Sequence, residues 1–458
     1  MLQTSKTLSN LQQLFHEWEP VDQGNNIIHT STDFGNIVQG KPQLIARPET
    51  VSDLIRLIQC ANQESISITP RGGGNSQSGQ SISADGISLD VSCFNEIERL
   101  PGQVRCGAST TWRQLVEALG SQGQLPTVMP LNLDLTVGGT LSAGGFSANS
   151  HRYGATIDHV DALELVTGRG DVLSCNPQHH SDSFAAALGG LGQCAVITSA
   201  TLALRPIKSQ VRLFYLLYDS FNQWLDDQQR LSSEQQVDYL EGFCAATVQG
   251  LFKTSAGRRP LRHWLYGLHV GVEFNSEPST KDSILEGLKY QQCLHVEDDA
   301  VIDFAARYDA RFQAMKASRA WQQPHPWFEC LLPLSAARDL IPKILHLLPP
   351  YFGDGHRVIF LAEQTSPPFF MKPSQLPAVV FAILPTGIPP NHLQSALKHL
   401  KTVHDWVIEA GGKRYLSGWL GMMTPVDWQQ HYGDQSLAFH DLKRRLDPNH
   451  VLRSVLLP

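Results

Sequence analysis

The sequence predicts an α+β protein whose chain changes character near Pro206. Before that point the residues are rich in Gly and Ser and alternate short strand-like with helix-like segments; after it, aromatic-rich stretches typical of antiparallel strands take over. Three glycine-rich loops also lie in the first part, each beside a predicted strand. At about 100–200 residues per domain, 458 residues allow two to four domains. We expect a nucleotide-type domain first and a sheet-and-helix domain second.

In the first part, helical spacing predicts a helix over residues 48–63, with Thr50 as its cap. Its predicted apolar face consists of Val51, Leu54, Ile55 and Ile58. Strands are predicted at 65–69 and 86–92. Thr111 and Gln114 form a capping box that begins another helix, and Gly120 is predicted to end it.

Further along, residues 163–174 predict a hairpin that turns at 168–171, and residues 194–206 predict a long strand closed by proline. In the second part, strands are expected at 263–274 and 325–333, with a helix over 335–347. Prolines cluster at 367–390 and predict a loop region there. The last forty residues have a helical pattern again.

The composition limits the function classes. Charged residues make up 17% and hydrophobic residues 42% of the chain, which supports large buried cores and excludes wholesale disorder. A formal net charge of −7 does not favour nucleic acid or an anionic membrane, so we expect neither as a partner. The longest apolar run, residues 378–384, is far shorter than the ~20 residues of a membrane-spanning helix.

Two features favour a cytoplasmic location. Residues 1–6 are polar and lack the apolar core of an export signal. The eight cysteines include no pair at CxxC spacing, so neither a redox pair nor a zinc site is indicated.

Among the 18 histidines, the adjacent His179 and His180 have no further ligand at metal-binding spacing. We therefore expect no metal.

The first glycine loop, RGGGNSQSGQ at residues 71–80, directly follows a predicted strand. Consecutive glycines allow positive φ and let several N–H groups point at one anion, usually a phosphate. The alternative is a glycine-rich hairpin turn. The loop is not a Walker motif, since no Gly-Lys-Ser/Thr follows, and Gln77 stands where a dinucleotide fingerprint has its third glycine.

Two more loops of this kind follow in the chain. Residues 135–145 read LTVGGTLSAGG, with four glycines and three hydroxyls, and residues 189–193 read GGLGQ just before the long strand. Three such loops in one domain are hard to explain as turns alone. Together they predict a large, flat, phosphate-bearing cofactor that needs close approach of the backbone.

These motifs resemble a known superfamily. The segments PRGGGNSQSGQ, LTVGGTLSAGG, HRYG and LGGLGQCAVIT are similar to the FAD-binding domain of the vanillyl-alcohol oxidase/p-cresol methylhydroxylase type, and within it to cytokinin dehydrogenases. HPWFECLLP and EAGGKRYLSGW extend the similarity over nearly the whole chain. The resemblance implies a PCMH-type FAD domain over residues 1–206, completed by 420–458, and an antiparallel-sheet-plus-helices substrate domain over 207–419.

The resemblance also implies which residues contact FAD. They are expected in the three loops, in the long strand, and at a tyrosine near the end of the second domain. The implied contacts are Arg71, Gly72, Gly73, Gly74, Asn75, Ser76, Gly79, Gln80, Thr136, Gly138, Gly139, Ser142, Phe146, Val196 and Tyr415.

Departures from the family decide how far its chemistry carries over. Asn75 occupies the place of a histidine that the relatives bond covalently to flavin, and residues 128–139 contain no cysteine for a second link. We therefore expect FAD to be held without a covalent bond. Residues 453–456 also depart from the family's terminal SPGQ, so some cofactor contacts there are expected to differ.

The family's proton-accepting aspartate matches Leu131 here, so another group must act if catalysis is kept. The candidates are Asp134 nearby, Glu329 in place of a family asparagine, and His269 in place of a family glutamate. For each of these three, a structural or solvated role is the open alternative. Tyr153 is a candidate proton relay. The substrate pocket is expected to include Leu131 and Trp327.

The expected function is that of an FAD-dependent oxidoreductase. It removes hydride from a small amine or alcohol, in a specialised-metabolite pathway, and passes the electrons to O2 or another acceptor. Two alternatives stay open: a flavoprotein fold that only binds a ligand or partner, and a true cytokinin dehydrogenase with a relocated base. The oligomeric state is not predicted.

Overall fold

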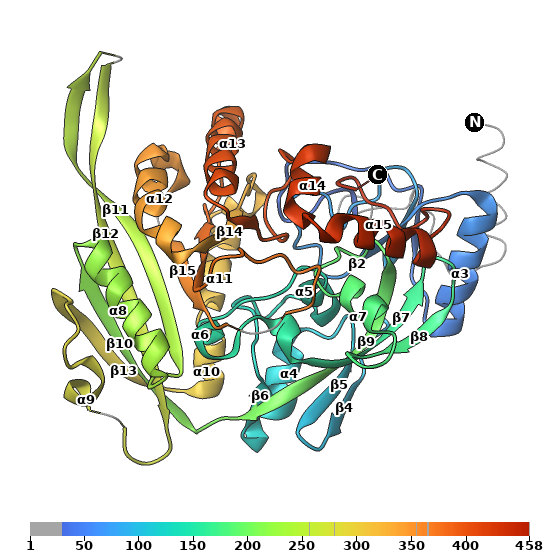
Figure 1. Cartoon of the computed structure of the whole chain (residues 1–458), viewed down its shortest axis with the longest axis horizontal. Coiled ribbons are helices and arrows are strands. Elements are labelled where there is room, and N and C mark those ends of the chain that lie inside the picture. The colour runs from blue at the N-terminus through green and yellow to red at the C-terminus, as the bar shows by residue number, and fades with distance from the viewer. Residues whose placement is uncertain (1–29, 256, 279, 354, 364–365, 458) are drawn as a thin grey trace.

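The computed structural model describes residues 30–255, 257–278, 280–353, 355–363 and 366–457, and these form two groups of elements that lie side by side (Figure 1). Within them, the strands make three sheets, of three, six and eight strands. The expected two-domain α+β architecture is thereby confirmed. Residues 1–6, on which the expectation about export rests, lie outside the described residues.

The first domain begins with a small parallel sheet in the order β1-β3-β2. Its strands are β1 (Leu44–Ala46), β2 (Ile68–Arg71) and β3 (Ile87–Asp90). Helix α3 (Val51–Glu64) packs on it and begins as predicted, because the Thr50 side chain accepts from Asp53 N while the Asp53 carboxylate accepts from Thr50 N. The buried face of α3 is Leu54, Leu57, Ile58 and Ala61, with Val51 and Ile55 at its rim.

The six-stranded sheet of this domain has the order β4-β5-β9-β7-β8, with β6 paired to β9. Its strands are β4 (Ile97–Leu100), β5 (Gln103–Gly107), β6 (Gln124–Pro126), β7 (Val160–Thr167), β8 (Val172–Cys175) and β9 (Ala195–Pro206). The expected hairpin is β7–β8 and the expected long strand is β9, which sits at the centre of the sheet.

Helix α4 (Trp112–Leu119) carries the predicted capping box of Thr111 and Gln114. The predicted end at Gly120 is only partly right. Gly120 is still right-handed, at φ −60°, and the chain continues as a 3-10 turn until Gly123, where φ is +69°. Gly123 is therefore the residue whose left-handed backbone ends the helical segment.

The second domain is built on an antiparallel sheet in the order β13-β10-β12-β11-β15-β16-β14-β17. Its strands are β10 (Gln210–Tyr218), β11 (Tyr239–Thr254), β12 (Gly257–Phe274), β13 (Gln292–Ala300), β14 (Phe328–Pro333), β15 (His356–Leu361), β16 (Ala378–Ile383) and β17 (Lys413–Arg414). The two longest, β11 and β12, form a hairpin that projects beyond the rest of the molecule (Figure 1).

Helices α8 (Phe221–Glu234), α12 (Leu334–Leu347) and α13 (Leu393–Glu409) cover one face of this sheet. The side chains of β14 show which face each residue occupies, because successive side chains of a strand point to opposite faces of the sheet. Phe328, Cys330 and Leu332 pack among the helices. Leu331 packs instead in the core shared with the first domain, so Glu329, two residues before it, lies on the face toward that domain.

The predicted loop region at 367–390 contains a strand. Residues 378–383 form β16, between β15 and β14, and each of them is buried. This explains the apolar run at 378–384: a central strand with both faces covered has no polar alternation. The prolines flank the strand instead of excluding it.

The end of the chain returns to the first domain, where α14 (Pro425–Tyr432) and α15 (Gln435–Leu446) pack with α7 (Ser181–Ala187) (Figure 1). After them the chain pairs with β2, since Ile68 N donates to Val451 O at 2.6 Å and Arg453 N donates to Ile68 O at 3.1 Å.

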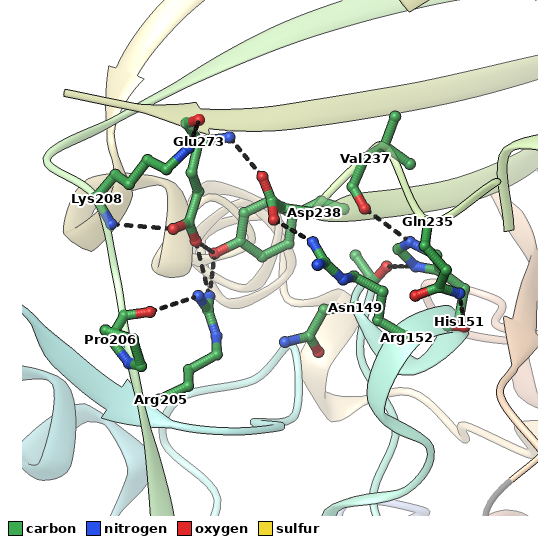
Figure 2. A network of polar contacts seen from close by, with 12 residues as sticks. Asn149, His151, Arg152, Arg205, Pro206, Lys208, Gln235, Val237, Asp238 and Glu273 are labelled. Carbon is green, nitrogen blue, oxygen red and sulfur yellow. Dashed lines mark hydrogen bonds and ion pairs between the residues drawn. The ribbon is translucent and has the colours of Figure 1, made fainter. Parts of the chain in front are cut away.

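A buried polar network joins the two domains, as Figure 2 shows. Arg205, at the end of β9, donates to Glu273 at 2.9 Å and to the Tyr239 hydroxyl at 2.6 Å. The Arg205 and Glu273 side chains are only 12% and 4% exposed, so the pair is shielded from water. On the other side of the network Arg152 pairs with Asp238, whose second oxygen accepts from Glu273 N. These contacts hold the start of β11 and the end of β12 against the first domain.

Among the helices of the described ranges, none has the length and apolar character needed to span a membrane.

Candidate functional site

The three glycine loops converge on one crevice, which encloses about 1120 Å³ of empty space, its open mouth included. Most of the residues predicted to contact a cofactor line it. They are Arg71, Gly72, Gly73, Gly74, Asn75, Ser76, Gln80, Thr136, Gly138, Gly139, Ser142, Val196 and Tyr415. The third loop contributes Leu191 and Gly192. We call this crevice the first cavity.

Two predicted contacts do not line the first cavity. Phe146 lines a neighbouring cavity instead, with its ring 4.8 Å from that of Tyr415. Gly79 packs outward: a Cβ on it would lie 2.9 Å from Val455 and 3.0 Å from Val38. Residues 453–456, which differ from the family's terminal SPGQ, therefore pack against the side of the first loop that faces away from the cavity.

Close contacts between the loops explain the glycines. A Cβ on Gly72 would lie 2.4 Å from Thr136 Oγ1, and one on Gly138 would lie 2.8 Å from the Ala108 Cβ. Real Cβ atoms do not approach other atoms to 2.4 Å, so the first and second loops reach this spacing only because a side chain is missing. Thr136 also caps the short helix α5 (Val137–Leu141) by accepting from Gly139 N at 3.3 Å.

Asp33 anchors the first loop, and the sequence pattern did not reveal it. It is buried, and its Oδ2 accepts from Gly79 N at 2.8 Å and from the Ser76 hydroxyl at 2.9 Å. Burial raises the pKa of Asp33 to about 6, against the opposing effect of these hydrogen bonds. Backbone bonds from Phe34 N to Gly74 O and from Gly35 N to Ser76 O add to the support.

Lys443 of α15 anchors the third loop in the same way. Its ammonium donates to Gln193 O at 2.6 Å and to Leu452 O at 2.9 Å, and it pairs with Asp447. The Asp447 carboxylate accepts in turn from Val451 N and Leu452 N. The sequence placed this segment in the first domain but offered no signal for the buried lysine.

The first cavity fits FAD. Six glycines and six serines or threonines are among its lining residues, so a large planar molecule can approach the backbone closely, and a Cβ at Gly72 would collide with Thr136 of the second loop. Gly74, at φ +67°, and Gly192, at φ +70°, turn the first and third loops. Such turns gather N–H groups that suit a diphosphate.

A second cavity adjoins the first and encloses about 1020 Å³ of empty space, its mouth included. The two share Asn75, Pro130, Leu135, Tyr415 and Ser417 as a common wall. A molecule in the second cavity would therefore lie next to one in the first. Both residues predicted to bind substrate, Leu131 and Trp327, line the second cavity.

The floor of the second cavity is the face of the large sheet opposite α8, α12 and α13. Glu329 pairs with Ala382 across β14 and β16, and Ala382 pairs with Arg357 across β16 and β15. All three line the cavity, as do Val380 and Ile359, which pair in the next row of the same face. The sheet thus presents a carboxylate, a small side chain and a guanidinium in one row.

Glu329 sits where this floor meets the wall shared with the first cavity. Its carboxylate accepts a hydrogen bond from the Ser417 hydroxyl, and Ser417 lines both cavities. Burial raises the pKa of Glu329, against that hydrogen bond and the nearby charges of Arg414 and Arg357. A carboxylate with a raised pKa is suited to accept a proton near neutral pH.

The structure does not bring the other three catalytic candidates to either cavity. Asp134 is 53% exposed and pairs with Arg113 at 2.8 Å. His269 lies on the same face of the sheet as the cavity floor, but on the more distant strand β12, where its ring packs between those of Tyr215 and Phe243. Burial lowers the pKa of His269 to about 4, which keeps it neutral near pH 7. Tyr153 lies beside Arg152 and His159, at the edge of the interdomain network.

Aromatic side chains form a further wall of the second cavity. Phe34 contacts the rings of Trp321 and Trp327 at centroid distances of 4.7 and 4.9 Å. Phe312 extends the wall, with its ring 6.2 Å from that of Trp321. Only Trp327 was predicted here, since Phe34 stands in a polar stretch and carries no periodic signal.

In the residues covered by the structure, no group of three or more His, Cys, Asp or Glu side chains is arranged to hold a metal ion.

Comparison with known proteins matches both domains. Residues 42–176 match the family model of an FAD binding domain, and residues 208–454 match the model described as "Cytokinin dehydrogenase 1, FAD and cytokinin binding". The chain is 30% identical to the uncharacterized oxidoreductase ORF5 in the fasciation locus of Rhodococcoides fascians, over 93% of this chain and 96% of that protein.

Plant proteins are also similar. The chain is 28% identical to cytokinin dehydrogenase 9 of Oryza sativa, over 93% of this chain and 88% of that one. It is 27% identical to cytokinin dehydrogenase 1 of Arabidopsis thaliana, over 93% of this chain and 80% of that one.

Proposed function

The chain belongs to the cytokinin dehydrogenase family of FAD-dependent oxidoreductases, and from that premise we propose that it dehydrogenates a small amine or alcohol held in the second cavity. When bound, FAD supplies the acceptor for the hydride that the substrate loses. The observation that carries the proposal is the shared wall of Asn75, Tyr415 and Ser417, which puts the two ligands side by side.

Glu329 is the proposed base. It takes the proton from the substrate's O–H or N–H group as the neighbouring C–H bond breaks. Its position on the cavity floor and its raised pKa support this role. Ser417, which donates to its carboxylate, is the proposed positioning residue.

Tyr415 orients the shared wall. Its hydroxyl accepts from Gly145 N at 2.8 Å, and its ring contacts Phe146 at a centroid distance of 4.8 Å. Because these contacts fix the ring between the cavities, Tyr415 would hold substrate and FAD in one relative orientation. The aromatic wall would exclude water from the reacting bond.

The FAD is proposed to be held without a covalent bond. Asn75 lies at the junction of the two cavities, and its amide donates to Gly73 O at 3.2 Å. An amide nitrogen is a far weaker nucleophile than an imidazole or a thiolate. Acid precipitation of the purified protein should release all the yellow colour into the supernatant; flavin that stays in the pellet would contradict the proposal.

The catalytic proposal is tested by anaerobic reduction. The purified protein is mixed without oxygen with single amines and alcohols, and the loss of oxidised-flavin absorbance is followed. We expect a small amine or alcohol to bleach the flavin and readmitted O2, or an added artificial acceptor, to restore it. A protein that retains FAD but is bleached by neither class would overturn the proposal.

We also propose a cytoplasmic location. All eight cysteines are free, and five of them are buried, as expected for a chain kept in a reducing compartment. Fractionation of cells that produce the protein tests this, and recovery in the secreted fraction would contradict it.

A further inference from the structure

We propose that the substrate carries a carboxylate and that Arg357 binds it on the floor of the second cavity. The inference rests on the proposed function only in taking this cavity as the substrate site. It adds the chemical class of the substrate: an amine or alcohol with an apolar body and one carboxylate.

The first observation is the position of Arg357. It stands in the same row of the sheet as Glu329, with Ala382 of β16 between them, and all three line the cavity. Adjacent strands lie about 4.8 Å apart, so the two backbones are separated by about 10 Å. The small Ala382 side chain leaves the space between the acid and the guanidinium open. A short molecule can therefore reach both groups at once.

The second observation is the charge around Arg357. It pairs with Glu241 at 3.4 Å, but Arg307 pairs with the same carboxylate at 3.3 Å. Glu241 also accepts from the Tyr308 hydroxyl and is only 2% exposed. Burial opposes the charge of Glu241, yet the two arginines outweigh it and hold its pKa below the ordinary range. The buried Arg357 and the partly buried Arg307 thus share one anion, so this cluster carries one positive charge in excess.

The third observation is an unsatisfied donor. The Arg357 side chain is 8% exposed, and its buried Nε has no hydrogen-bond partner among the described residues. Its guanidinium also packs over the Tyr308 ring at 4.1 Å and the Phe243 ring at 5.3 Å, which fixes its plane. A buried cation without full compensation is costly, and a planar guanidinium forms paired hydrogen bonds with a carboxylate. A bound carboxylate would supply the missing charge and acceptors.

Other groups of the cavity agree with an anionic ligand. Arg311 also lines it, and donates to Leu384 O at 2.8 Å. Glu329 is the one acidic side chain among the residues lining this cavity, and burial disfavours its charged form.

The test is calorimetric binding of phenylacetate and of phenylacetamide, its neutral analogue, to the FAD-loaded protein. The wild type is expected to bind the carboxylate about tenfold more tightly than the amide or better. In Arg357→Gln this preference should fall to about one. In the matched control Arg212→Gln, which removes a guanidinium of the same sheet that pairs with Asp298 and lines no part of this cavity, it should persist.

Equal binding of the two probes by the wild type overturns the proposal, as does the same loss of preference in both variants. If Arg357→Gln does not fold, Arg357→Lys, which keeps the charge, should still reduce the preference for phenylacetate over phenylacetamide several-fold. An unchanged preference in Arg357→Lys would then overturn the proposal. Glu329→Gln separates this proposal from the one on catalysis. It should retain the preference for the carboxylate while losing reduction of the flavin, so either proposal can fail alone.

Discussion

Glycines, serines and threonines make up nearly half of the residues that line the first cavity, whereas the second is lined mainly by aromatic, aliphatic and charged side chains. The backbone determines the shape of the first cavity, because its segments approach closely where Gly72 and Gly138 have no Cβ. In the second cavity the reactive groups are side chains on the strands of a sheet, such as Glu329 and Arg357. A backbone cradle suits one fixed cofactor, while a side-chain pocket can be rebuilt for another substrate by single substitutions.

The largest expected effect tests the second cavity. Glu329→Gln should lower the rate of anaerobic flavin reduction by about 10²–10⁴-fold, the usual contribution of a general base. The FAD content should not change, because Glu329 does not line the first cavity. Stopped-flow absorbance measures the rate. Asp134→Asn is the matched control: its carboxylate pairs with Arg113 outside both cavities and its loss should leave the rate unchanged. Near-normal reduction by Glu329→Gln would remove it from the mechanism.

The pH profile sharpens the same assignment. Glu329 must be deprotonated to accept a proton, and its pKa lies above the ordinary range because of burial. The rate of flavin reduction should therefore fall as pH decreases through that raised pKa, by about tenfold per unit below it. Ser417→Ala removes the donor that stabilises the charged form, so the fall should move to higher pH. A profile that is the same in both proteins would show that another group titrates.

Gly72→Ala tests the backbone cradle. The new Cβ would lie 2.4 Å from Thr136 Oγ1, so one of the two loops must shift. Overpacking of this kind costs about 1–3 kcal/mol, which corresponds to about a tenfold or greater loss of FAD affinity if the loops move apart. Titration of the apoprotein with FAD measures it. Gly267→Ala is the control, since its Cβ would meet only Phe243, at 3.6 Å. Equal FAD affinity in both variants would contradict the close packing of the loops.

Asp33 tests how the first glycine loop is held in place, since its carboxylate bonds Ser76 and Gly79 of that loop. Burial raises its pKa to about 6 from the ordinary value near 3.9, so the folded state holds this proton more tightly than the unfolded state does. Its contribution to stability is complete below about pH 4 and is lost as pH rises through about 6, by about 3 kcal/mol. Denaturant unfolding at both pH values should show this decline in the wild type but not in Asp33→Asn. Parallel pH dependences would contradict the assignment.

The smallest expected effect is a partial change in flavin attachment at the boundary between the cavities. Asn75→His restores the nucleophile that the relatives use, at a position that lines both cavities. We expect part of the flavin to remain with the acid-precipitated pellet of the variant, with little change in stability. Gln77→His, on the same loop but lining only the second cavity, is the control. Complete release from Asn75→His would indicate that the loop holds its side chain away from the flavin.

The sequence by itself determined the backbone part of this protein. Glycine spacing predicted the three loops, capping boxes located α3 and α4, and alternation predicted β9 and the β7–β8 hairpin. These signals are local, because capping and left-handed turns depend on residues a few positions apart. The same local signals supported the resemblance to the FAD-binding family, which the comparisons confirmed.

Only the tertiary structure decided which side chains meet. Glu329 reaches the cavity because its register on β14 places it on the face opposite Phe328 and Cys330, and a strand pattern alone does not say which face is covered. Arg357, Glu241 and Phe34 come from three distant segments, and Asp134 turns to Arg113 because that cation lies beside it. Long-range pairing brings these groups together, and no local spacing encodes it.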